Sequence, residues 1–111
     1  MVTGTCIIRK VFVEGTIMKL IGLKVDRECY DASNVLKQAG VRFEYVEIGA
    51  SAENMIYFTH LRDTRPEFDV LKAQGFVGLP CFLMEDGRIL FDENEVITEF
   101  EEAEAAETIS A

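Results

Sequence analysis

The chain has 111 residues, the length of one domain, which would bury about two thirds of the surface that the unfolded chain exposes. Hydrophobic residues make up 49% of it and charged residues 28%, a composition typical of globular proteins rather than disordered ones. Its 20 acidic and 11 basic residues give a net charge of −9, which argues against nucleic acids and anionic membranes as partners, because their phosphates attract Lys and Arg.

The first half of the chain is expected to form strand, strand, helix and strand. Cys6–Val13 is rich in β-branched and aromatic residues, and the continuous apolar run Ile17–Val25 is typical of a strand buried on both faces. Asp26 is placed to cap a helix that ends at Gly40, and Val41–Ile48 is a further strand. The apolar residues at helical spacing are Cys29, Ala32, Val35, Leu36 and Ala39. Strand, helix and strand with short connections predict a right-handed parallel unit.

The segment Ser51–Gly75 is expected to be helical with one break. Ser51 can start a first piece that runs to about Leu61. Thr64 can cap a second piece that has Pro66 in its first turn, where proline is tolerated. The residues of this second piece expected to face the core are Phe68, Leu71 and Val70.

A hairpin and a last helix are expected to complete the chain. Cys81–Met84 is a short apolar strand, and Asp86-Gly87 is a strong signal for a two-residue hairpin turn. Ile89–Phe91 would return antiparallel to the first strand of the hairpin. Asp92 or Asn94 can cap a final helix, whose apolar residues are Val96, Ile97 and Phe100.

Four local motifs, in this order of elements, resemble the small bacterial glutaredoxin-related proteins of the thioredoxin-like superfamily. They are Asp26-Arg27-Glu28-Cys29 at a helix start, the stretch LRDTRPEF from Leu61 to Phe68, Gly78-Leu79-Pro80-Cys81 before a strand, and the turn Glu85-Asp86-Gly87. The resemblance implies an α/β protein of the thioredoxin/glutaredoxin-like fold, with a central mixed four-stranded sheet flanked by helices.

The resemblance covers Met18 to about Ile97, so a glutaredoxin-like domain is expected over residues 18–106, followed by a tail at 107–111. Residues 1–17 lie outside the resemblance. They are either an extra N-terminal strand, which could pair across a homodimer, or the result of a start codon chosen too far upstream, and the sequence leaves both alternatives open.

Carrying the family motif over to this chain shows a change at the helix start. Glutaredoxins begin this helix with Cys-x-x-Cys or Cys-x-x-Ser, and the first cysteine is the nucleophile. Here the first position is Asp26 and the second is Cys29. The Asp26 carboxylate cannot attack a disulfide, so it is either a structural helix cap or a group that positions a cation or proton of a partner.

The reactivity of Cys29 is open from the sequence. A helix start favours its thiolate, whereas the carboxylates of Asp26 and Glu28 oppose it and Arg27 offsets part of that opposition. A buried, inert thiol is an equal alternative.

The resemblance also implies that the Leu79–Pro80 peptide is cis and faces the helix start, where it would hold an extended substrate backbone. Asp26, Arg27, Leu79 and Pro80 are therefore the candidate substrate-binding residues. Cys81 follows directly, so Cys29 and Cys81 are the candidate catalytic thiols if they pair, with a packed core residue as the alternative for Cys81.

Cofactor and metal sites have less support. Glutathione-binding members tend to carry a Gly-Gly pair where this chain has Phe91-Asp92-Glu93-Asn94, and Lys24 is the one helpful cation near the site. No metal is expected, since the cysteines at 6, 29 and 81 and the surface residue His60 do not form the close pairs that zinc sites use.

The expected location is the reducing cytoplasm. Three cysteines without close spacing do not make a secreted disulfide framework, and the sequence has neither an apolar run of membrane-spanning length nor a signal peptide. The sequence therefore predicts a glutaredoxin-like thiol–disulfide oxidoreductase family member with a degenerate Asp-x-x-Cys site and weak or lost activity, acting on protein thiols. The alternative is a noncatalytic thioredoxin-fold module that binds an extended peptide.

Overall fold

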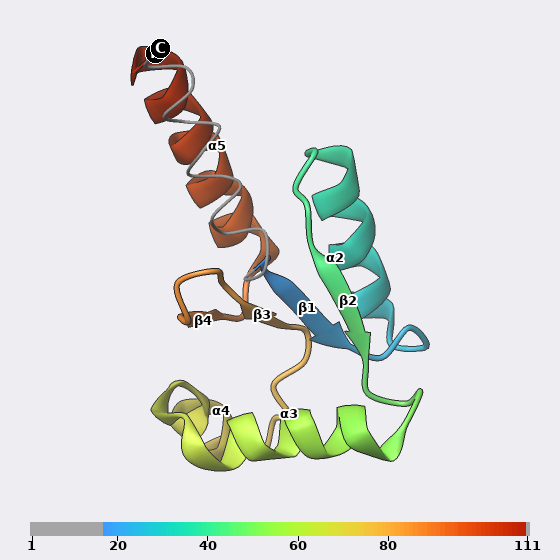
Figure 1. The fold of residues 1–111 in the computed structure, drawn as a ribbon. Coiled ribbons are helices and arrows are strands. Elements are labelled where there is room, and N and C mark those ends of the chain that lie inside the picture. The colour runs from blue at the N-terminus through green and yellow to red at the C-terminus, as the bar shows by residue number, and fades with distance from the viewer. Residues whose placement is uncertain (1–16, 111) are drawn as a thin grey trace.

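A computed structural model describes residues 17–110 of the chain, which form a mixed α/β fold around a four-stranded mixed sheet with the strand order β2-β1-β3-β4 (Figure 1). The elements in chain order are β1 (Lys19–Gly22), α2 (Arg27–Gln38), β2 (Glu44–Glu47), α3 (Ala52–Thr64), the 3₁₀ turn η2 (Pro66–Phe68), α4 (Asp69–Ala73), β3 (Cys81–Leu83), β4 (Ile89–Leu90) and α5 (Glu93–Ser110). This order agrees with the one expected from the sequence, and the strand expected over Cys6–Val13 lies outside the described residues.

The strand pairings fix which chain ends meet at which end of the sheet. β1 is parallel to β2, with α2 as the crossover between them, and antiparallel to β3, which turns back into β4. In the β1–β3 pair, Ile21 lies opposite Cys81 and Lys19 lies opposite Leu83. The end of β1 and the start of β3 therefore lie side by side, while the β3–β4 hairpin lies at the opposite end of the sheet.

Apolar side chains cover both faces of the sheet, because successive residues of a strand point to opposite sides. On one face, α2 and α5 pack on Leu20 and Phe82. On the other face, α3 and the η2–α4 segment pack on Ile21, Cys81 and Ile89 (Figure 1). The sheet is thus a middle layer between two helical layers, as expected for strands that read as continuous apolar runs.

Three helix ends lie where the sequence places them. The Ser51 hydroxyl accepts the Asn54 N–H at 3.1 Å at the start of α3, and the Asp92 carboxylate accepts the Asn94 N–H at 2.9 Å at the start of α5. Gly40, with φ of +80°, follows the last turn of α2 in the left-handed conformation that favours glycine. The cap expected at Thr64 is wrong, because α3 continues through Thr64 and its hydroxyl donates instead to the His60 carbonyl at 2.7 Å.

Other sequence expectations are corrected by the packing. The apolar run that ends at Val25 is a strand only as far as Gly22, and the Val25 side chain is 92% exposed because the chain turns there. Val70 is also exposed, while Phe68 takes the core position. The hairpin turn has three residues rather than two, since the Met84 N–H pairs with the Arg88 carbonyl.

No helix in the described range is both long and apolar enough to cross a membrane.

Candidate functional site

The site begins with a close approach between β1 and α2. A Cβ atom on Gly22, the last residue of β1, would lie 2.8 Å from the Cys29 Sγ and 3.0 Å from the Tyr45 Oη. No ordinary side chain fits at such distances, so glycine at this position allows the first turn of α2 to rest on the end of β1. The connection is a tight turn, in which the Asp26 N–H donates to the Leu23 carbonyl at 3.0 Å.

Asp26 occupies the position before α2 but does not cap the helix with its side chain. Its backbone is extended, and its carboxylate makes no hydrogen bond to the first-turn N–H groups. Instead the Cys29 Sγ donates to the Asp26 Oδ2 at 3.2 Å. The expected side-chain cap is therefore wrong, because the carboxylate accepts a hydrogen bond from the Cys29 thiol instead of from the N–H groups of the first turn.

Cys29 is a buried thiol with low acidity. Its side chain is fully buried, and this burial raises its pKa to about 12 despite an opposing backbone hydrogen bond from Leu23. The hydrogen bond to Asp26 and the negative charges of Asp26 and Glu28 raise the pKa further. Burial and the neighbouring negative charges thus both favour the protonated thiol of Cys29.

Cys81 is equally buried but packs on the other side of the sheet. Its neighbours are the apolar residues around Ile21 and Phe68, whereas Cys29 lies on α2, which covers the face of Leu20. Burial raises the pKa of Cys81 to about 12, with the charge of Arg65 lowering it and that of Glu67 raising it. Cys29 and Cys81 are free thiols, and the structure does not bring them together as a dithiol pair.

The start of β3 pairs with the end of β1, so Leu79 and Pro80, which precede β3, lie at the end of the sheet where the chain turns toward α2. The peptide bond between them is cis, and the register that pairs Ile21 with Cys81 continues to place Pro80 next to Gly22. Among residues 17–110, neither the N–H nor the C=O of Leu79 has a hydrogen-bond partner. The structure therefore leaves both backbone polar groups of Leu79 unpaired, at the end of the sheet where the chain turns toward α2 (Figure 1).

The Arg62 guanidinium fixes this loop through two hydrogen bonds. Its Nε donates to the Val77 carbonyl at 2.9 Å and its Nη2 donates to the Phe76 carbonyl at 3.2 Å. Gly78 follows with φ of +97°, and a Cβ there would lie 2.7 Å from the Phe68 ring. Arg62 and Phe68 belong to the stretch LRDTRPEF, so this stretch positions the loop that precedes Pro80. In the sequence, the stretch stands out only through the resemblance to glutaredoxin-related proteins.

The side chains around this loop are mostly apolar. Val25 precedes Asp26, and Phe76 and Val77 precede the Leu79–Pro80 peptide; Phe76 is 57% exposed and Val77 is 56% exposed. We call Val25, Asp26, Phe76, Val77 and the backbone of Leu79 the loop surface; the Leu79 side chain itself packs on the core around Phe68.

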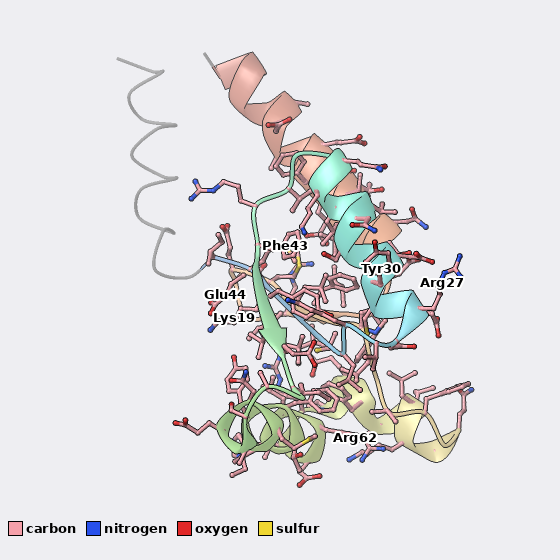
Figure 2. All side chains as sticks on the ribbon, turned by 90° about the vertical axis from the view of Figure 1, so that its right-hand side faces the viewer. Lys19, Arg27, Tyr30, Phe43, Glu44 and Arg62 are labelled. Atoms are coloured by element: carbon pink, nitrogen blue, oxygen red, sulfur yellow. The ribbon has the colours of Figure 1, made fainter. Side chains whose placement is uncertain are left out.

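Arg27 is not part of the loop surface. Its side chain is 88% exposed, pairs with Asp31 at 3.3 Å and extends into solvent on the outer side of α2 (Figure 2). Lys24, the candidate cation, lies with its Nζ 5.6 Å from the centre of the Tyr45 ring. Nothing in the sequence indicates the Tyr45 hydroxyl at this site: it is buried without a hydrogen-bond partner among residues 17–110, and burial raises the pKa of Tyr45.

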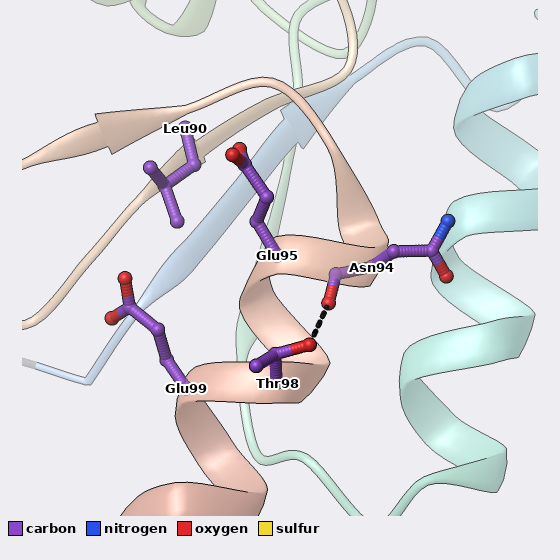
Figure 3. Close-up of a pocket in the computed structure, with 5 residues that line it drawn as sticks. All are labelled: Leu90, Asn94, Glu95, Thr98 and Glu99. Carbon is purple, nitrogen blue, oxygen red and sulfur yellow. Dashed lines mark hydrogen bonds between the residues drawn. The ribbon is translucent and has the colours of Figure 1, made fainter.

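No group of three or more His, Cys, Asp or Glu residues within the described range could hold a metal ion. A shallow pocket of about 320 Å³ lies away from the loop surface, between β4 and α5 (Figure 3). Its lining residues are Leu90, Asn94, Glu95, Thr98 and Glu99.

Comparison with known proteins gives one relative. An uncharacterized protein of Haemophilus influenzae is 40% identical over 57 residues, which are 51% of this chain and 66% of the relative. The chain thus spans slightly less than two thirds of the relative's length. No family model matches the chain, and no solved structure matches it.

The raised pKa of Cys29 predicts slow alkylation. At pH 7.5, iodoacetamide should modify Cys29 in the folded protein at least about a hundredfold more slowly than in the urea-unfolded protein, because each unit of pKa increase lowers the thiolate fraction about tenfold. The rate in the folded protein should keep rising above pH 8.5, where a free thiol is already half ionised. Mass spectrometry of the tryptic peptide that contains Cys29 measures both rates, and equal rates would contradict the assignment.

Proposed function

We propose that this chain has the thioredoxin-like fold, is related to the small bacterial glutaredoxin-related proteins, and acts as a noncatalytic module that binds an extended peptide. The strand order β2-β1-β3-β4 and the directions of the strands support the fold. The observation that carries the binding function is the unpaired backbone of Leu79, in a loop that also presents the exposed side chains of Phe76 and Val77.

The loss of redox activity follows from the two residues at the helix start. Thiol–disulfide exchange requires a thiolate that reaches the substrate sulfur. Asp26 stands where the nucleophile would be, and Cys29 is buried, protonated and hydrogen-bonded to Asp26. Cys81, on the far side of the sheet, supplies no second thiol to this surface.

Peptide binding uses backbone groups and apolar side chains, and it does not require a reactive thiol. A partner segment in extended conformation can exchange hydrogen bonds with the Leu79 N–H and C=O, which gives affinity that is independent of its sequence. Side chains of the partner can then lie on Val25, Phe76 and Val77 and bury apolar surface. Arg62 and Phe68 hold the loop in place before the peptide arrives, which reduces the entropy lost on binding.

A charge placed on the loop surface should weaken peptide binding. Dodecapeptides would be selected from a random phage-display library on the full chain, and their affinities measured by fluorescence anisotropy. Val77→Asp should weaken binding at least tenfold, because the new carboxylate is desolvated under the peptide.

Ile56→Asp is the matched control, since Ile56 is an apolar residue of α3 that is 66% exposed and lies outside the loop surface. We expect it to change affinity less than twofold. Failure to select any peptide, or equal loss with both variants, would refute the proposed binding function.

Returning a thiol to the helix start should restore redox activity if the relationship to glutaredoxins is correct. Asp26→Cys re-creates the Cys-x-x-Cys spacing and removes the carboxylate that raises the pKa of Cys29. We expect it to reduce insulin disulfides in the presence of dithiothreitol at least tenfold faster than wild type, which should not exceed the background rate.

Asp31→Cys, on the same helix but one turn further along, controls for the addition of a thiol and should stay at background. Activity of the wild-type protein equal to that of Asp26→Cys would contradict the noncatalytic assignment. An inactive Asp26→Cys variant would contradict the relationship to glutaredoxins.

A further inference from the structure

The Asp26 carboxylate is the charged group of the loop surface, and most of its capacity to accept hydrogen bonds is unused. It is half-buried, and within residues 17–110 its one side-chain hydrogen bond is the donation from the Cys29 thiol to Oδ2. It does not cap α2, and none of the ion pairs formed by the described residues includes it. A carboxylate can accept about four hydrogen bonds, so most of its acceptor sites stay open.

The cations of the protein nearest in sequence or at this end of the sheet are engaged elsewhere. Arg27 pairs with Asp31, Lys24 lies over the Tyr45 ring, and Arg62 donates to the carbonyls of the loop. The thiol that does reach Asp26 is a weak, uncharged donor. The carboxylate therefore has a fixed orientation, set by Cys29, and no charge partner in the described structure.

The surroundings favour a cation from outside. The exposed Glu28, two residues after Asp26 in the first turn of α2, adds a second negative charge. The whole chain carries a net charge of −9. Val25, the residue next to Asp26, is 92% exposed, so an apolar side chain of a bound segment that lies on it would help to exclude water from the carboxylate. Hydrogen bonds between a cation and a carboxylate are stronger than those between neutral groups, and stronger still where water is excluded.

We propose that the segment bound at the loop surface presents a lysine or arginine side chain to Asp26. This inference rests on the proposed peptide-binding function and adds the chemistry of the partner: an extended segment with one basic residue flanked by apolar residues. Its backbone pairs with Leu79, its cation binds Asp26, and its apolar side chains cover Val25 and Val77. Asp26 thus discriminates between peptides, whereas Leu79 binds any of them.

The test compares the peptides selected by wild type, Asp26→Asn and Asp31→Asn from the same random dodecapeptide library. Wild type and Asp31→Asn should enrich Lys or Arg at one fixed position, and Asp26→Asn should lose this preference while keeping the apolar one. Asp31 is the matched control because it is an exposed aspartate of α2 that pairs with Arg27. In a double-mutant cycle, replacing the enriched basic residue by norleucine should weaken binding to wild type at least tenfold and to Asp26→Asn less than twofold.

Substitutions in the peptide keep the test decisive if Asp26→Asn fails to fold. The norleucine peptide, and a peptide with glutamate at the same position, must both bind wild type at least tenfold more weakly than the selected peptide. Selected peptides that depend on Val77 but show no basic preference would overturn this inference and leave the proposed function standing. No selected peptides at all would overturn both, as would a wild-type dimer in sedimentation that Val77→Asp converts to a monomer, because a second copy would then cover the surface.

Discussion

The contact between the first turn of α2 and Gly22 is the constraint on which the rest of the site depends. Cys29 lies so close to Gly22 that the helix can sit there only because this residue lacks a side chain. The contact places Asp26 at the end of β1. The pairing of Ile21 with Cys81 places Pro80 beside Gly22, at the same end of the strand. Two loops that are some fifty residues apart in the sequence therefore meet at one surface.

The other loop is held by an independent set of contacts from the opposite face of the sheet. Phe68 packs edge-on against Phe58 and Phe91, with ring centres 5.9 and 5.0 Å away, and leaves space only for glycine at position 78. Arg62 fixes the two carbonyls that precede this glycine. One layer of helices thus positions Asp26 and the other positions Leu79, so the surface between them is prepared by the core rather than by contacts within the surface itself.

Local signals in the sequence were sufficient for the order of elements and for several of their ends. Ser51, Asp92 and Gly40 act within one turn of the chain, which is why their roles could be predicted. Strand ends were harder, because an apolar run does not show where the chain leaves the sheet, and Val25 is the clearest example.

Features that depend on contacts between distant segments could not be predicted in this way. The separation of Cys29 from Cys81 results from the alternation along β1 and β3, which directs Cys81 to the face of α3. The roles of Arg62 and the buried Tyr45 hydroxyl require knowledge of which loop or helix packs above them. The resemblance to glutaredoxins drew attention to the residues at 26, 79 and 80, whereas the burial of the thiol at 29 and its hydrogen bond to Asp26 come only from the packing.

The central claim is that the start of α2 and the Leu79–Pro80 peptide share one surface, and paramagnetic relaxation tests it most directly. A nitroxide attached to a Val25→Cys variant in a Cys6→Ser background would label only the exposed thiol, because Cys29 and Cys81 are buried. The amide signals of Gly78 and Leu79 should be strongly broadened, while that of Gly87, in the hairpin at the opposite end of the sheet, should be much less affected. Sharp signals from Gly78 and Leu79 beside the oxidised label would show that the two loops lie apart, and would contradict the account.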